Sequence, residues 1–239
     1  MEKLGCVLWK PVGTPDAAFA KSLREAAPAL TRLGAHALRV NVVDDDVAAG
    51  AAVRVGRMDP PKAAFVTFWL HEAADLHGPI FATLAALASR VAAYLVVESV
   101  PIRNTTQVAP PGERTPGFNL VTCIVPRDGL SYDEFLERWH VEHRRVALET
   151  QPTFSYVRNE IVRALTPDAP QWAAIVEEGF PIEALTDPMV WYAADGSQER
   201  LVANRKRMIA SCAAFLALDR VEAHPMSEYA FGPSAVPVV

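Results

Sequence analysis

Two histidines, His140 and His143, lie three residues apart in the stretch SYDEFLERWHVEHRRVAL, residues 131–148. At about 100° per residue along a helix, Trp139 and His143 fall roughly 40° and 80° from Phe135, inside one apolar stripe. His140 falls at roughly 140°, at the edge of that stripe. We therefore expect His143 on the buried face of a helix and His140 beside it.

A histidine inside an apolar stripe could transfer protons. Burial lowers the pKa of an imidazole and favours its neutral form, which acts as a general base near pH 7. The alternative is a core histidine whose nitrogens bond backbone carbonyls. The first half of the chain has Leu23 and Ala27 where the second has Trp139 and His143. Since that helix packs without an imidazole, the contrast favours a chemical role for His143.

A group of arginines follows these histidines in an otherwise acidic chain. Guanidinium groups bind carboxylates through two parallel hydrogen bonds, so an arginine in a cavity would favour an anionic substrate. Salt bridges with nearby surface glutamates are the alternative. The residues concerned are Arg144, Arg145, Arg158 and Arg163.

Aromatic and strand residues could complete such a site. His71 ends an apolar strand and could reach a cavity mouth, and Trp191 and Tyr192 could line an aromatic wall. Solvation of His71 and core packing of the two aromatic residues are the alternatives. Alternation along a strand separates two faces without telling which one meets a cavity. One face carries Ser155, Val157 and Asn159, and the other Tyr156 and Arg158.

Several kinds of chemistry lack their motifs. His140 and His143 could touch one metal, but Glu142 lies about 100° from His143 around the helix, so no metal site is expected. The chain contains no G-x-S-x-G elbow, G-x-G-x-x-G turn or P-loop. This argues against an ordinary α/β-hydrolase and against nucleotide-dependent chemistry.

The composition of the chain narrows its expected binding partners and its cellular compartment. The net charge of −5 over 239 residues does not favour nucleic-acid or anionic-membrane binding. Three distant cysteines without a CxxC pair read as reduced thiols, which indicates a cytoplasmic protein. The N-terminus reads as a strand, and Arg90 interrupts the longest apolar run, residues 81–97, so neither a signal peptide nor a membrane span is expected.

The elements that would position these residues come in the same order on both sides of a segment rich in proline and glycine, residues 101–117. That order is β-α-β-β-α-β, which is typical of a ferredoxin-like unit. In the first half we expect strands at 4–10, 36–43, 63–70 and 94–100, with helices from about residue 14 and up to Val91. In the second half we expect strands at 118–125, 154–162, 189–193 (MVWYA) and 226–231, with helices from Ser131 and over 197–218.

The predicted fold class is therefore α+β, with two ferredoxin-like repeats in one chain. Two such sheets can cover each other and close a barrel-like layer, and we expect the substrate cavity between them. The predicted boundaries are a diverged first repeat over 1–103, a linker over 104–116, a second repeat with the site over 117–232, and a tail over 233–239.

FLERWHVEH resembles the EthD-type domain of the dimeric α/β-barrel superfamily over about residues 117–231. The resemblance rests on Phe135, Trp139 and His143, then on Tyr156 and Asn159; the MVWYA segment and the region of Glu228 are also similar. Many relatives have a small residue and a proline after the histidine, where this chain has two arginines. The resemblance implies enzymes acting on small aromatic, polyketide or ring-cleavage compounds, often without metal or organic cofactor, although some superfamily members bind haem.

These observations lead to a functional expectation. We expect a small-molecule enzyme without redox cofactor, in which His143 transfers protons during isomerisation, dehydration or hydrolysis of a conjugated or aromatic-derived carboxylic compound. His140 and Tyr156 would assist catalysis. Substrate binding is assigned to Arg144, Arg158, Asn159, Trp139, Trp191, Tyr192 and His71.

Other functions remain open at this point. They are a haem or hydrophobic-ligand binding protein, a cofactor-free monooxygenase, and a non-catalytic assembly module. The expected partner is a small molecule, anionic and partly apolar, without nucleic acid or membrane. A homodimer is also possible for this chain.

Overall fold

The computed structural model describes residues 1–73 and 78–232, so the tail expected at 233–239 lies outside the described residues. The first half contains β1 (Glu2–Trp9), α1 (Asp16–Arg32), β2 (His36–Val42), the 3-10 helix η1 (Asp45–Val53), β3 (Ala64–Leu70), α2 (Pro79–Leu87) and β4 (Arg90–Ile102).

The second half begins with β5 (Phe118–Ile124) and a helical stretch made of α3 (Tyr132–Glu137), the π-helical turn η2 (Arg138–His143) and α4 (Arg144–Thr150). It continues with β6 (Ser155–Ala164), β7 (Ala174–Phe180), η3 (Ile182–Leu185), α5 (Pro188–Trp191), α6 (Gln198–Phe215), η4 (Leu218–Arg220) and β8 (Glu222–Phe231). The expected helix start is confirmed, because Ser131 and Glu134 form a complete capping box.

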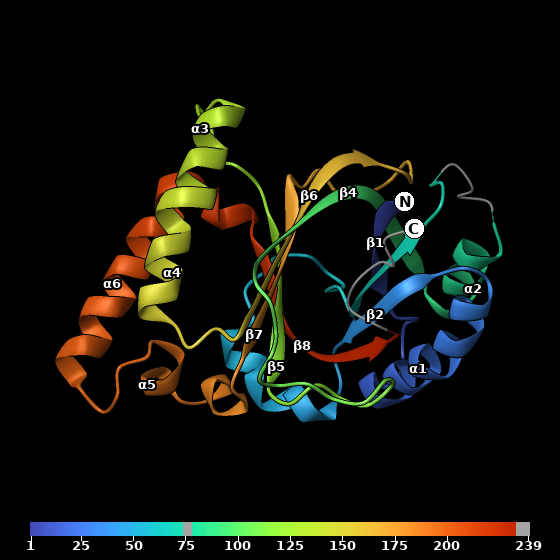
Figure 1. The fold of residues 1–239 in the computed structure, drawn as a ribbon, viewed down its shortest axis with the longest axis horizontal. Coiled ribbons are helices and arrows are strands. Elements are labelled where there is room, and N and C mark those ends of the chain that lie inside the picture. Colours follow the sequence, from blue (N-terminus) through green and yellow to red (C-terminus); the bar gives the residue numbers. More distant parts are fainter. Residues whose placement is uncertain (74–77, 233–239) are drawn as a thin grey trace.

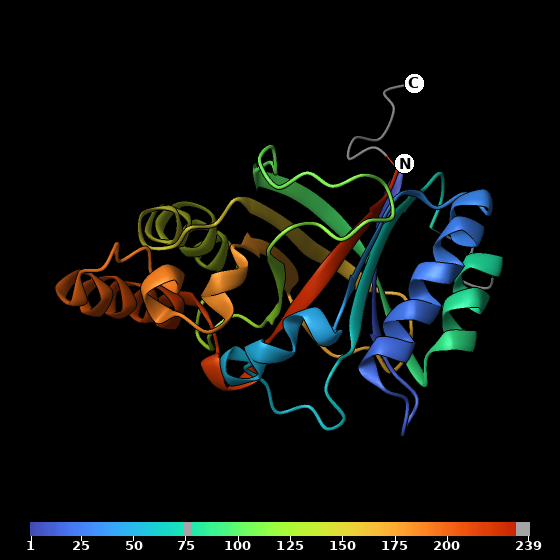
Figure 2. The same ribbon diagram turned by 90° about the horizontal axis from the view of Figure 1, so that it is seen from below.

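The strands of the described chain form one closed barrel in the order β1-β3-β2-β8-β5-β7-β6-β4. All neighbouring pairs are antiparallel, and the barrel closes through β2 with β8 and through β4 with β6. Helices α1 and α2 cover the strands of the first half, while α3, α4 and α6 lie on the opposite side against those of the second half (Figures 1 and 2). The expected mixed fold with a closed barrel is confirmed.

One expected strand is wrong. MVWYA overlaps the short helix α5, whose first residue is Pro188 and whose preceding Asp187 accepts a hydrogen bond from the Met189 backbone N–H at 2.7 Å. An acidic cap followed by proline is a helix start. The strand of this half is instead β7, which pairs with both β5 and β6. In the first half, the helix expected to reach Val91 ends at Leu87, because β4 begins at Arg90.

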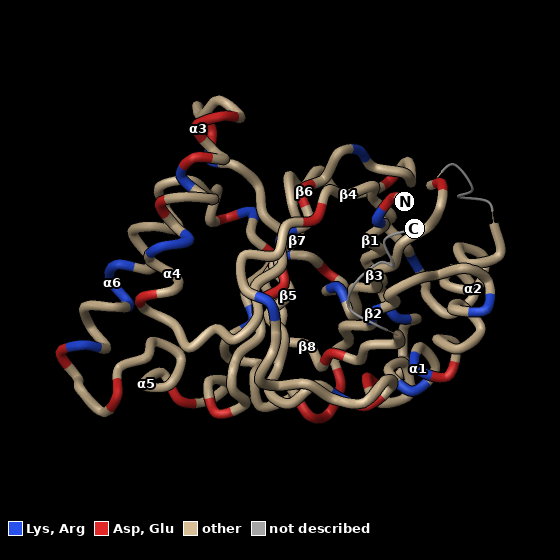
Figure 3. Tube along the Cα trace, in the orientation of Figure 1, with Lys and Arg blue, Asp and Glu red and all other residues tan. Residues whose placement is uncertain are grey.

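The inside of the barrel is partly polar. Lys3 on β1 donates to Asn159 on β6 at 2.7 Å, and the Asn159 amide donates to Glu177 on β7 at 2.9 Å. Asn41 on β2 also donates to Glu177, at 2.8 Å. Figure 3 shows basic and acidic residues on the barrel strands as well as on the outer helices. These bonds satisfy the buried charges and tie the strands of the two halves together.

Within the described residues, no helix is long and apolar enough to span a bilayer.

Candidate active site between the helices and the sheet

A cavity of about 340 Å³ lies between the outer face of the second-half strands and the helices that cover them. Strands β5, β6 and β7 form its floor, and η2, α5 and α6 form its walls. Its side chains capable of chemistry are His143, Tyr156, Glu178, Tyr192 and Cys212. Aromatic and aliphatic residues, such as Trp139, Trp191, Met208, Ile209 and Phe215, form most of the rest. We call this space the helix–sheet cavity.

His143 lies on the π-helical turn and is buried, as expected from its place in the apolar stripe. Its Nδ1 is 2.9 Å from the Ser211 hydroxyl, and its ring centroid is 4.8 Å from that of Phe215. Nε2 has no hydrogen-bond partner among the described residues. Burial lowers the pKa of His143 to about 4, so the imidazole is neutral at pH 7. One ring nitrogen is thus held in place while the other is free for a ligand.

Glu178 is the residue that sequence reasoning missed. It stands on β7 between Leu120 on β5 and Tyr156 on β6, and it lines the helix–sheet cavity. Its carboxyl group has no hydrogen bond or ion pair with any other described residue. Burial in these apolar surroundings raises the pKa of Glu178 from its ordinary 4.5 to about 7. Near neutral pH this group can therefore either accept or release a proton.

The signal for Glu178 was present in the sequence. AIVEEGF places two adjacent glutamates in an otherwise apolar strand. Because successive side chains point to opposite faces, one glutamate must face each side of the sheet. Glu177 points into the barrel network, and Glu178 points to the helix–sheet cavity.

Tyr156 and Trp139 are joined on the same side of the sheet. The Trp139 indole Nε1–H donates to the Tyr156 hydroxyl at 2.9 Å, and both side chains are buried. Burial, followed by the charge of Glu178, raises the pKa of the Tyr156 phenol above its usual range. The phenol thus stays protonated and can donate one hydrogen bond.

The predicted site residues that line this cavity are His143, Tyr156, Trp139, Trp191 and Tyr192. The arginines lie elsewhere. Arg144 is exposed. The Arg158 guanidinium stands 5.7 Å from the centres of the Trp139 and Tyr156 rings, and its Nε donates to the Ser99 hydroxyl at 3.0 Å. Neither arginine lines the helix–sheet cavity.

Three further predicted residues also lie outside the cavity. His140 packs against Trp139 with ring centroids 4.6 Å apart, and its Nε2 is 3.4 Å from a Glu160 oxygen. Burial, followed by the charge of Arg158, lowers the pKa of His140. Asn159 belongs to the network inside the barrel. His71 is in the first half, where its ring centroid is 5.7 Å from that of His36.

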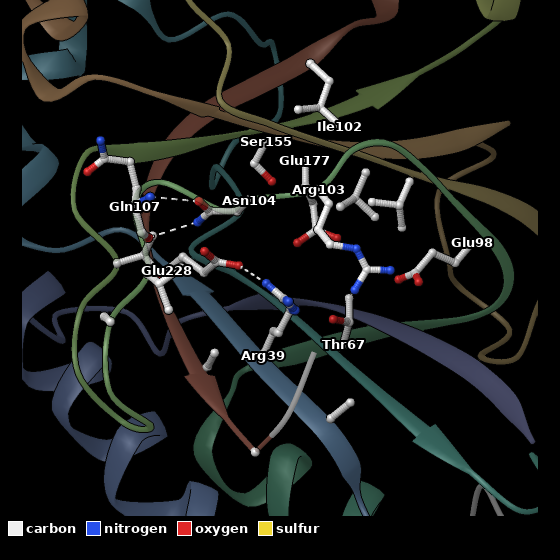
Figure 4. Close-up of a pocket in the computed structure, with 18 of the residues that line it drawn as sticks. Arg39, Thr67, Glu98, Ile102, Arg103, Asn104, Gln107, Ser155, Glu177 and Glu228 are labelled. Carbon is white, nitrogen blue, oxygen red and sulfur yellow. Dashed lines mark hydrogen bonds and ion pairs between the residues drawn. The ribbon is translucent and has the colours of Figure 1, made fainter. Parts of the chain in front are cut away.

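The place of the site also differs from the expectation. A cavity of about 500 Å³ does lie inside the barrel, at its mouth, and Ser155 and Val157 line it (Figure 4). Tyr156, on the opposite face of β6, lines the helix–sheet cavity instead. His143 therefore faces a cavity outside the barrel wall, because the helices pack on the outer face of the sheet.

No family model matches the chain, and no curated protein matches it. Among solved structures, an anthrone oxidase-like protein is similar over 100% of this chain and 96% of its own, with 9% identity and a TM-score of 0.53. A candidate monooxygenase from Lactobacillus acidophilus is similar over 98% and 97%, with 12% identity and a TM-score of 0.45. A candidate monooxygenase from Fusobacterium nucleatum is similar over 96% and 91%, with 9% identity and a TM-score of 0.46.

These names contradict the main functional expectation. The similar structure with the TM-score of 0.53 is named after an oxidase, so the expectation of an isomerase, lyase or hydrolase is wrong. At these identities the likeness concerns the fold. The likeness confirms the expected fold, a closed barrel of the dimeric α/β-barrel type, and it does not show the EthD-type family.

Proposed function

We propose that the helix–sheet cavity is the active site of a cofactor-independent oxygenase that deprotonates an aromatic substrate and lets it react with O₂. The observation that carries this proposal is Glu178, a carboxyl group without a protein partner among the described residues, in an apolar cavity. Burial raises the pKa of Glu178 to about 7, which suits a general base at neutral pH.

The lining of the cavity supports a neutral, flat substrate. Trp139 and Trp191 offer aromatic surface, and Met208 and Ile209 offer aliphatic surface. None of the described residues that line the cavity is a lysine or an arginine. An anionic substrate would meet Glu178 with no compensating cation, so we propose a neutral polycyclic or phenolic compound in place of the anionic one expected from the sequence.

The chemistry needs no electron carrier in the protein. Glu178 removes a proton from a carbon that aryl and carbonyl groups acidify, and the resulting carbanion passes an electron to O₂. Recombination at that carbon, with return of the proton from Glu178, gives a hydroperoxide, and loss of water gives a ketone. Overall, a CH₂ group and O₂ become C=O and H₂O, with four electrons passing from carbon to oxygen.

His143 and Tyr156 would hold the substrate oxygen. The Tyr156 hydroxyl accepts a hydrogen bond from Trp139 at 2.9 Å, which leaves its proton free to be donated into the cavity. The neutral His143 imidazole, fixed at Nδ1 by Ser211, presents Nε2. A hydrogen bond from either group would stabilise the oxyanion that forms when the substrate is deprotonated.

Two comparisons support this assignment. Among the residues that carry the sequence resemblance to EthD-type domains, Trp139, His143 and Tyr156 line the cavity together, whereas Phe135 does not line it and Asn159 lies inside the barrel. A similar solved structure is named anthrone oxidase-like, and an anthrone is a neutral polycyclic compound with an acidic CH₂.

We also propose that the two halves are diverged ferredoxin-like repeats, since each has the strand and helix order β-α-β-β-α-β.

Haem is the second candidate for this cavity, and it fits less well. His143 would hold the haem iron through Nε2, because Nδ1 is bonded to Ser211 and Nε2 has no partner among the described residues. The described lining offers no cation for the propionates, however, and Glu178 adds an acidic group. We therefore propose a protein that works without haem.

The test uses the purified full chain with anthrone as the probe. We expect a protein without a Soret band that consumes one O₂ per ketone formed, at a rate unaffected by a chelator. Glu178→Gln should lose turnover at least 100-fold, while Glu142→Gln, at an exposed position on η2, should not change it. A Soret band that disappears in His143→Gln, or equal turnover in Glu178→Gln, would overturn the proposal.

A further inference from the structure

The cavity at the mouth of the barrel, shown in Figure 4, is lined by Ser155 and Val157, whereas Tyr156 on the opposite face of β6 lines the proposed active site. It measures about 500 Å³, and the connection between β4 and β5 forms one wall. Asn104 shapes this connection: its side chain accepts from the Gln107 N–H and donates to the Gln107 carbonyl, both at 2.9 Å. We call this space the barrel-mouth cavity.

Most charges in the barrel-mouth cavity are already compensated. Lys3 pairs with Glu98 and lies 4.0 Å from Glu177. Glu177 also accepts hydrogen bonds from two asparagine side chains. Arg39 pairs with Glu228. The buried carboxylates are therefore bonded to groups of the protein itself.

Three donors lack such partners. The Arg103 side chain is exposed, points into the cavity, and has no hydrogen bond or ion pair with another described residue (Figure 4). The Thr67 hydroxyl is completely buried at the cavity wall and has no partner in the described part of the chain. The Ser155 hydroxyl, which also lines the cavity, makes no hydrogen bond within the described residues. Buried polar groups are rarely left unpaired, so Thr67 indicates a bonding partner from outside the chain.

The remaining lining is apolar and suits the body of a small organic molecule. Trp69, Val100 and Ile102 come from β3 and β4, Val157 comes from β6, and Val108 comes from the connection. The cavity volume lies within the range of small-molecule sites.

We propose that the barrel-mouth cavity is a second binding site, and that it takes a small aromatic or aliphatic monocarboxylate. The carboxylate would form paired hydrogen bonds with the Arg103 guanidinium, and its body would lie against Trp69 and the neighbouring aliphatic residues. Thr67 and Ser155 would donate to the ligand oxygens. This site is independent of the oxygenase chemistry proposed for the helix–sheet cavity.

The test is calorimetric titration with benzoate, compared with neutral benzamide and cationic benzylamine. We expect benzoate to bind the wild type at least tenfold more tightly than benzamide. Arg103→Gln should weaken benzoate binding at least tenfold, and Thr67→Val should weaken it several-fold. Arg144→Gln, which removes an exposed arginine on the outer helices, should bind like the wild type.

A further variant locates the ligand. His143→Gln alters the helix–sheet cavity alone, so it should leave benzoate affinity unchanged. Loss of binding in this variant, with normal binding in Arg103→Gln, would place benzoate in the other cavity and overturn the proposal. Failure of benzoate to bind at millimolar concentration, or tighter binding of benzylamine, would also overturn it. Because Arg103 is exposed, its replacement should leave the fold intact, which circular dichroism would verify.

Discussion

Glu177 and Glu178 are neighbours on β7 whose carboxyl groups lie on opposite sides of the barrel wall. Inside, Glu177 accepts hydrogen bonds from Asn41 at 2.8 Å and from Asn159 at 2.9 Å. Outside, Glu178 lines an apolar cavity without a described partner, and burial raises the pKa of Glu178 to about 7. One strand thus holds a structural carboxylate and a carboxyl group that can exchange protons.

The first prediction concerns the pH dependence of turnover. If Glu178 is the base, kcat/KM for O₂ consumption should rise with pH through a midpoint near 7, because only the ionised carboxyl accepts a proton. Glu178→Gln should lower the rate at least 100-fold and remove this midpoint. His143→Gln should lower the rate about tenfold with the midpoint unchanged. If His143, with a pKa near 4, were the base, the rate would instead be flat from pH 6 to 9.

The second prediction concerns stability. The folded-state pKa of Glu178, about 7, is above its ordinary 4.5, so its stabilising effect is present at low pH and is lost as pH rises through 7. Glu178→Gln removes this half-buried charge. Its free energy of unfolding should match the wild type at pH 4 and exceed it by about 1–3 kcal/mol at pH 8. Urea denaturation at both pH values measures this, with the exposed Glu142→Gln as control. An equal effect at the two pH values would contradict the linkage.

Much of the fold and part of the site follow from the sequence. The apolar stripe of the helix placed His143 and Trp139 on the buried side, because residues three and four apart share one helical face. The alternation of side chains along β6 could not tell which face of the strand meets which cavity, since a period of two fits either face equally well. The outcome depends on where the helices pack: Tyr156 faces the helix–sheet cavity, and Asn159 faces the inside of the barrel.

Other features needed tertiary structure. Glu178 becomes a site residue because α6 covers β7, a contact between segments that are distant in the chain. Arg158 looked like a ligand for substrate but bonds Ser99 across the seam between β4 and β6. Local sequence patterns do not show that β4 of the first half pairs with β6 of the second half. The hydrogen bond between Arg158 and Ser99, which depends on this pairing, could therefore not be predicted.

The third prediction concerns the buried hydrogen bond between Trp139 and Tyr156, which measures 2.9 Å. Tyr156→Phe leaves the indole N–H of Trp139 without its acceptor in a buried place. The free energy of unfolding should fall by about 1–3 kcal/mol. The double variant Tyr156→Phe/Trp139→Phe should lose less free energy of unfolding than the two single variants combined, since the unpaired indole N–H is no longer present. Simple additivity in this double-mutant cycle would show that the bond contributes nothing.

The fourth prediction concerns Lys3, whose side chain is only 3% exposed and pairs with Glu98. Lys3→Met leaves Glu98 and Glu177 without their nearest cation, and removing one partner of a buried pair costs about 3–5 kcal/mol. Lys21→Met is the matched control, because Lys21 forms an exposed pair with Glu25 on α1. Urea unfolding should show a large loss of the free energy of unfolding for Lys3→Met and little change for Lys21→Met. Similar losses would mean that the network inside the barrel is not stabilising.

The last prediction concerns Gly117, which precedes β5 with a φ of +87°. A Cβ at this position would lie 2.2 Å from the Phe180 carbonyl oxygen, so Gly117→Ala forces the start of the β5–β7 ladder apart. Gly13 has a similar φ of +79°, but a Cβ there meets nothing within 4 Å. Gly13→Ala should therefore cost only the backbone strain of about 1–2 kcal/mol.

Gly117→Ala should lower the free energy of unfolding clearly more than Gly13→Ala does, because the backbone around Phe180 must move. The displacement would reach the proposed active site, since Phe180 stacks on Trp191 at 5.0 Å and Trp191 lines the helix–sheet cavity. Urea unfolding measures the stability of both variants, and near-ultraviolet circular dichroism reports the aromatic stack. Equal destabilisation with unchanged aromatic signals would show that this contact is not tight, and that the wall of the cavity does not depend on it.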